Sequence, residues 1–149
     1  MRKNIKEFIK KVAALDDSPE SISRGIAIGF FFGLSIFWGL QILLALIFAQ
    51  LLHANRKAAV IMTAVSNPFT TPIIYPLCYN IGHFIINDPV KSVDYNSLSS
   101  VKDIINLGLP FLEAILTGTI LLGGAGAAVL YFISKKYLEK RKACINKNN

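Results

Sequence analysis

Polar side chains interrupt two of the longest apolar stretches of the chain, where they could contact an ion, water or a lipid headgroup. Asn67, Thr70 and Thr71 place an amide and two hydroxyls among three prolines. Proline removes backbone donors, so nearby carbonyl groups are left free for a ligand. Gln41 offers a second amide in the earlier stretch. These four residues are candidate substrate-binding groups; the alternative is that they only satisfy the local backbone at a kink.

Three charged residues are further candidates. Arg24 and Arg56 could bind a phosphate, because a guanidinium presents paired donors to it. Anchoring of positive charge on the cytoplasmic side explains the same residues without a ligand. Glu113 follows apolar residues, and a carboxylate inside a membrane could couple transport to protons or pair with an arginine. Alternatively, its helix begins close by and the carboxylate lies among headgroups.

Signals for an enzyme or a metal site are poor. The sequence has no nucleophile elbow, no phosphate-binding loop with its lysine, no paired carboxylates and no zinc spacing. His53 and His83 are far apart and have no acidic or thiol neighbours at ligand spacing. Cys78 and Cys144 lie in different environments, so we expect free thiols. We therefore predict no catalytic residues, no metal and no cofactor.

Three uncharged stretches must position the polar groups: 25–52, 58–87 and 114–134. Each reaches the roughly 20 residues that a helix needs to cross a bilayer. The first two are too long for one span and are interrupted midway. Irregular backbone at membrane depth needs protein or water around it, so both interruptions should face inward, and they are candidates to meet. We predict an all-α integral membrane protein with two broken or re-entrant hydrophobic segments and a C-terminal transmembrane helix.

The distribution of charge predicts the topology. Residues 1–24 and 135–149 carry six Lys or Arg each, whereas the 88–103 loop is poor in positive charge. Positive charge marks the cytoplasmic side, so both termini are expected there. A re-entrant hairpin over 25–52, a broken span over 58–87 and a return span over 107–133 satisfy this rule, although a conventional first span stays possible. The implied divisions are a basic amphipathic surface helix (1–17), a membrane domain (18–134) and a basic cytoplasmic tail (135–149).

Helix signals refine this outline. Ser18 is a good N-cap and Pro19 fits the first helical position, so a helix should begin there. Small residues recur every four positions on two faces, and membrane helices pack closely through such faces. The two faces, which are candidates to pack against each other, are Gly25, Gly29, Gly33 and Thr119, Gly123, Ala127.

An ordered series of short motifs resembles a bacterial membrane family catalogued as domain of unknown function 2062. The motifs are Ser18-Pro19-Glu20, the run from Arg24 to Ser35, Phe37-Trp38-Gly39-Leu40-Gln41, Asn55, the run from Ser66 to Pro72, Tyr75, Tyr79 and Gly82. Similar proteins often have proline where this chain has Ile36, which leaves Gly33 and Gly39 to supply the first bend. The resemblance implies a multi-pass protein of the bacterial inner membrane and implies almost nothing about activity.

Three functional hypotheses follow. The leading one is movement of a lipid or other amphiphile through a polar groove formed by the two breaks, with a homo-oligomer or a partner membrane protein completing the groove. The others are a non-catalytic scaffold for a larger membrane complex, and a proton or ion channel. The basic residues adjoin apolar segments, so we expect them to face membrane lipid and not nucleic acid.

Overall fold

The computed structural model describes residues 15, 17–37, 39–86 and 101–146, with only the backbone given for 101–107 and 145–146. Within these ranges the chain is entirely helical, which confirms the predicted all-α class. The helices are α2 (Pro19–Gly33), α3 (Leu40–Leu51), α4 (Arg56–Thr63), α5 (Thr71–Ile86) and α6 (Val101–Asn146). Most of the predicted surface helix over 1–17 lies outside the described residues.

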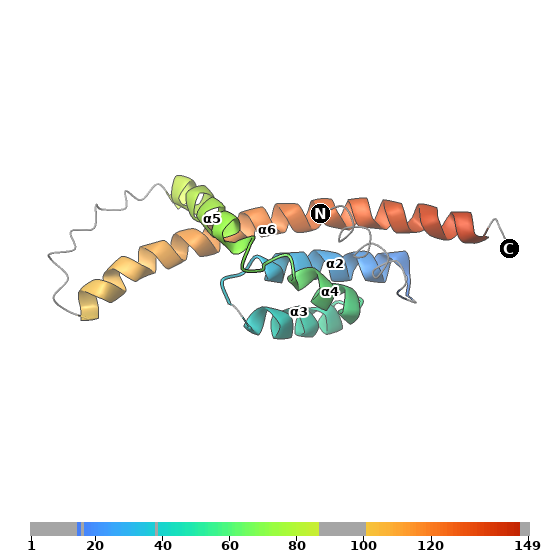
Figure 1. The fold of residues 1–149 in the computed structure, drawn as a ribbon, viewed down its shortest axis with the longest axis horizontal. Helices are drawn as coiled ribbons and strands as arrows, with labels where there is room; N and C mark the ends of the chain where they lie inside the picture. Colours follow the sequence, from blue (N-terminus) through green and yellow to red (C-terminus); the bar gives the residue numbers. More distant parts are fainter. Residues whose placement is uncertain (1–14, 16, 38, 87–100, 147–149) are drawn as a thin grey trace.

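Helix α2 is the centre of the packing. It lies along the C-terminal half of α6, and α3 and α4 cover its other sides, while α5 crosses α6 near the middle (Figure 1). The buried side chains are mostly small, such as Ala45, Ala49 and Ala59, which have no exposed surface. Many large apolar side chains point outward instead, including Phe84, which is 84% exposed, and Phe132, which is 69% exposed.

The first apolar stretch forms a helical hairpin. Ser18 caps α2 as predicted, because its hydroxyl accepts a hydrogen bond from the Ser21 N–H (3.1 Å) and Pro19 takes the first helical position. Helix α2 ends at Gly33, and the chain turns back through Gly39, whose φ of 85° suits glycine and strains other residues. Helix α3 then returns against α2. The predicted hairpin shape of 25–52 is therefore present in the fold.

A polar clamp holds the start of α2 to the turn before α4. The Asp17 carboxylate accepts hydrogen bonds from Asn55 Nδ2 (2.9 Å), Ser21 Oγ (2.7 Å) and the Ser18 N–H (2.7 Å). Asn55 also caps α4, because its Oδ1 accepts from the Ala58 N–H (2.9 Å). These contacts, led by the Asn55 amide, lower the pKa of Asp17 below its ordinary value.

The glycine face of α2 receives α4. A Cβ added at Gly25 would meet the Asn55 carbonyl oxygen, and one at Gly29 would meet that of Ala59. A Cβ at Gly33 would lie 3.1 Å from Thr63 Cα. Glycine here allows two backbones to approach closely.

The expected pairing of this glycine face with the small face of the last helix is wrong. Gly123 of α6 lies against the aromatic ring of Phe31, on a different side of α2. Thr119, on the same face of α6, is buried beside the Cys78 thiol of α5. Sequence periodicity identified two close-packing faces, but it carries no information on which helix lies opposite each face.

Helices α5 and α6 cross through another small-residue contact. A Cβ at Gly82 would meet the Ala114 carbonyl oxygen, and one at Gly118 would meet that of Cys78. Each helix thus supplies a glycine at the crossing. Cys78 is fully buried there as a free thiol.

Helix α6 is longer than the predicted return span. Among the described residues, it is the one helix long and apolar enough to cross a membrane, over Gly108–Cys144. It continues without interruption into the predicted basic tail, of which residues 135–146 extend the helix. Lys, Arg and Glu are good helix formers, which explains why the charged segment stays helical.

Candidate functional site

The two breaks in the apolar stretches meet each other, as the sequence indicated. A Cβ at Gly33, the last residue of α2, would lie 2.9 Å from Val65 Cγ1 in the segment between α4 and α5. The Tyr75 hydroxyl, one turn into α5, donates to the Ser35 carbonyl oxygen (3.4 Å). We call this meeting point of residues 33–37 and 39–41 with residues 63–75 the break junction.

The predicted ligands in the second break are engaged with their own backbone. Asn67 Oδ1 accepts from the N–H groups of Phe69 (2.9 Å) and Thr70 (3.1 Å), which stabilises the turn before α5. Thr70 Oγ1 donates to the Val65 carbonyl oxygen (2.7 Å), and Thr71 Oγ1 donates to that of Asn67 (2.8 Å). These hydrogen bonds match the alternative in which the side chains stabilise a kink.

Three other polar atoms at the break junction are buried without a hydrogen-bond partner among the described residues. They are Ser35 Oγ, Ser66 Oγ and Gln41 Oε1. Ser35 is 7% exposed and Ser66 is 8% exposed. A buried unsatisfied polar group costs about 1–3 kcal/mol, so each of the three calls for an explanation.

Gln41 was among the predicted ligands, whereas Ser35 and Ser66 were not. Both serines lie inside the breaks, where Ser35 ends one motif of the family resemblance and Ser66 begins another. Their position could have marked them, because each is a hydroxyl in a helix interruption that was expected to face inward. The sequence could not show which hydroxyls the backbone would use.

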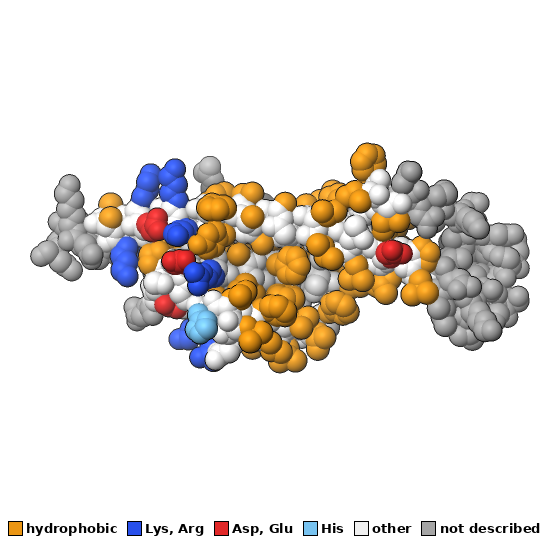
Figure 2. All heavy atoms as spheres, turned by 180° about the vertical axis from the view of Figure 1, so that it is seen from behind, with side chains coloured by type: hydrophobic (Ala, Val, Ile, Leu, Met, Phe, Trp, Pro, Cys, Tyr) orange, Lys and Arg blue, Asp and Glu red, His pale blue; other side chains and the backbone are white. Residues whose placement is uncertain are grey.

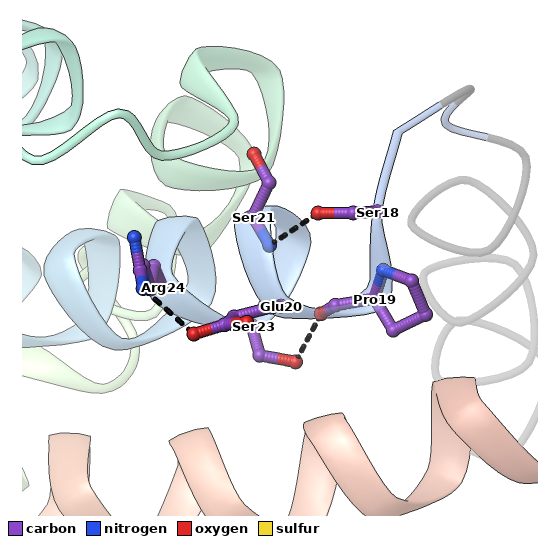
Figure 3. Close-up of polar contacts among 6 residues, drawn as sticks. All are labelled: Ser18, Pro19, Glu20, Ser21, Ser23 and Arg24. Atoms are coloured by element: carbon purple, nitrogen blue, oxygen red, sulfur yellow. Dashed lines mark hydrogen bonds and ion pairs between the residues drawn. The ribbon is translucent and has the colours of Figure 1, made fainter.

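Arg24 lies in the half of α2 that is farther from the break junction, and it lines a hollow. Its guanidinium forms an ion pair with Glu20, one helical turn earlier (2.6 Å; Figure 3). Below it, Ser23 is fully buried and donates to the Pro19 carbonyl oxygen (2.7 Å; Figure 3). An open hollow of about 330 Å³ is lined by Arg24, Ala27, Ile28, Leu52 and Tyr131.

The structure does not bring the remaining charged candidates to this hollow. Arg56 is exposed at the first position of α4 and is not among the residues that line the hollow. Glu113 is exposed on α6, and within the described part of the chain it makes no ion pair with Arg24 or Arg56. The proposed internal pairing of Glu113 with either arginine is therefore corrected.

The sequence profile of one family matches residues 2–144. The chain belongs to the family DUF2062, described as uncharacterised proteins conserved in bacteria. This confirms the resemblance drawn from the motifs between Ser18 and Gly82 and extends it over nearly the whole chain. No curated protein and no solved structure matches the chain. The DUF2062 description assigns no activity, so the function has to be argued from the geometry.

Proposed function

We propose that this DUF2062 chain is a multi-pass protein of the bacterial inner membrane that moves a lipid or similar amphiphile across the bilayer. The membrane placement rests first on where the apolar side chains lie. On the face drawn in Figure 2, a band of apolar side chains covers the middle of the molecule, and most of the charged side chains gather at one end. Exposed apolar surface on this scale is rare in soluble monomers and suits contact with acyl chains.

Helix lengths fit this placement. Lys135 follows Glu113 by 22 positions of α6, a rise of about 33 Å, against a hydrocarbon thickness of roughly 30 Å. Glu113 then lies at the far interface, among headgroups. Helices α2 and α3, with 15 and 12 residues, are about 22 and 18 Å long and too short to span. We therefore assign α2–α3 as a re-entrant hairpin, α4–α5 as a broken span and α6 as the return span.

The observation that carries the transport proposal is the break junction. Gly33 follows Arg24 by nine positions, about 14 Å along α2, so the junction lies near the middle of the apolar band. Broken helices that meet near the midplane are how many transporters build their binding sites. Ser35, Gln41 and Ser66 would contact the polar headgroup there, replacing the lining first expected from Asn67, Thr70 and Thr71.

The scaffold alternative would bind a partner protein through the glycine faces and the basic termini. Gly25, Gly29 and Gly33 lie against α4, and Gly123 lies against Phe31 of α2, so these glycines are not free for another protein. Two crossings and a hairpin still enclose little space. The transport proposal therefore includes a second copy or another membrane protein that completes the groove.

The test is the rate of lipid movement in vesicles that contain the full-length protein. A fluorescent phospholipid or isoprenoid phosphate is placed in both leaflets, and a membrane-impermeant quencher reports how fast the inner pool becomes accessible. Gln41→Leu should slow movement at least tenfold, whereas Gln50→Leu, an exposed glutamine on the same helix, should not. Likewise Ser66→Ala should slow it more than Ser134→Ala, whose hydroxyl is satisfied by the Leu130 carbonyl oxygen. Rates equal to those of protein-free vesicles for every lipid would refute the proposal.

A further inference from the structure

The hollow at the base of α2 combines a cationic rim with apolar walls. Arg24 forms the rim, while Ala27, Ile28 and Leu52 supply apolar surface from α2 and the end of α3. Tyr131 closes the side formed by α6. Its hydroxyl makes no hydrogen bond within the described residues. Lys135 Nζ lies 5.7 Å from the centre of the Tyr131 ring and adds a second positive charge.

We infer that this hollow binds the phosphate of an anionic glycerophospholipid from the cytoplasmic leaflet, with the start of one acyl chain against Ile28 and Leu52. The inference rests on the membrane placement in the proposed function and names the substrate class and its loading site. Glu20 takes one of the five guanidinium N–H donors of Arg24, so the others can bind phosphate oxygens. Glu20, Arg24 and Lys135 together leave one net positive charge at the rim.

The volume of the hollow fits part of a lipid molecule and not a whole one. Pockets that enclose a small molecule have volumes of about 300–1,000 Å³, and this hollow is at the lower limit. It can hold a headgroup phosphate and the first part of a chain, while the rest of the lipid stays in the bilayer. A wholly water-soluble phosphate would leave the apolar walls uncovered. The chemistry therefore favours a lipid source.

The hollow also lies on the route that the transport proposal requires. Arg24 is at the charged end of α2, and Gly33 of the same helix contacts the break junction. A lipid phosphate held by Arg24 is thus about half a bilayer from Ser35. Binding at the hollow would concentrate the substrate beside the point where its headgroup enters.

The test measures lipid binding to the full-length protein in nanodiscs of phosphatidylcholine doped with photoactivatable phosphatidylglycerol. We expect Arg24→Gln to reduce crosslinking to the protein roughly tenfold, equivalent to about 1.4 kcal/mol. Glu20→Gln should increase it, because it frees the guanidinium and removes the opposing charge. Leu52→Trp should reduce it by filling the hollow, whereas Leu51→Trp, on an adjacent exposed leucine outside the lining, should not.

Each result decides between the inference and the broader proposal. Crosslinking that is unchanged by Arg24→Gln and Leu52→Trp would overturn the lipid site, even if wild-type protein moves lipid. Preference for a polyprenyl phosphate, or equal displacement by inorganic phosphate, would also overturn the glycerophospholipid assignment. Crosslinking that follows the expected pattern in a protein with no lipid-movement activity would retain the site and refute the transport function.

Discussion

The contact between α2 and α4 predicts a large loss of stability when a single methyl group is added at Gly29. In Gly29→Ala the new Cβ would meet the Ala59 carbonyl oxygen, and it would lie 2.9 Å from the Ala59 carbonyl carbon and 2.8 Å from Met62 Cβ. None of these atoms is the end of a flexible side chain. Helices α2 and α4 must therefore move apart to accept the methyl group.

The expected magnitude follows from this geometry. Overpacking of a dense interior costs typically about 1–3 kcal/mol, and backbone atoms that cannot rotate away place Gly29→Ala near the upper end. Alanine regains about 0.5–1 kcal/mol relative to glycine through its better helix propensity. We expect a net loss of about 2 kcal/mol. The matched control is Gly124→Ala in α6, where an added Cβ has no neighbour within 4 Å. It should be neutral or stabilise the protein by up to about 1 kcal/mol.

Unfolding of the purified protein in mixed micelles, titrated with sodium dodecyl sulfate and followed by circular dichroism, measures both variants. Both variants replace a helical glycine by alanine, so they differ only in the atoms that the new methyl group meets. Equal stabilities of Gly29→Ala and Gly124→Ala, within about 0.5 kcal/mol, would refute the close approach of α2 and α4.

Three further predictions concern the crossing, the clamp and the topology. Gly118→Ala should separate α5 from α6 and make the buried thiol of Cys78 react with a membrane-permeant maleimide. In the wild-type protein, only the exposed Cys144 should react. An unreactive Cys78 in the variant would contradict the crossing. The lowered pKa of Asp17 means that its ionised form is preferred in the folded state, so its contribution to stability should be complete above the ordinary value of 3.8 and disappear as the pH falls through the lower folded pKa. Denaturation between pH 2 and 7 checks this. The free energy of unfolding should fall less toward acid pH in Asp17→Asn than in the wild type. Lys57→Cys, with both native cysteines replaced by alanine, should react with an impermeant maleimide only from the cytoplasmic side, and labelling from outside would exclude the re-entrant hairpin.

Local chemistry made much of the fold predictable. Ser18 and Pro19 marked the start of α2, because capping depends only on neighbouring residues. Gly33 and Gly39 marked the first break for the same reason, and the prolines near Asn67 marked the second. The predicted return span ended at residue 133, whereas α6 continues to Asn146, because charged residues do not oppose helix formation.

Partners at a distance were not predictable from one sequence. The spacing of Gly25, Gly29 and Gly33 identified a close-packing face, but not that α4 would occupy it. A short helix that begins with Arg56 and Lys57 has weak hydropathy, and its buried side is provided only by alanines and a threonine. This pattern gives little indication that α4 packs against α2, whereas the small-residue face of the long C-terminal helix was an evident candidate. Small residues predict that a helix face will be approached closely, but they do not identify the helix that approaches it.

The candidate site shows the same limit in its polar residues. Asn67, Thr70 and Thr71 had the strongest sequence signal because they cluster beside prolines, yet that clustering is what lets them satisfy the broken backbone. Ser35 and Ser66 had weak signals because a single hydroxyl does not reveal from the sequence whether the local backbone will accept its hydrogen bond, and in the described part of the fold neither hydroxyl has a partner. In an apolar environment, a polar group with no local partner has the most to gain from a ligand. The residues to change first in a search for function are therefore Ser35, Ser66 and Gln41, whereas changes at Asn67, Thr70 and Thr71 should lower stability before they alter the proposed lipid movement.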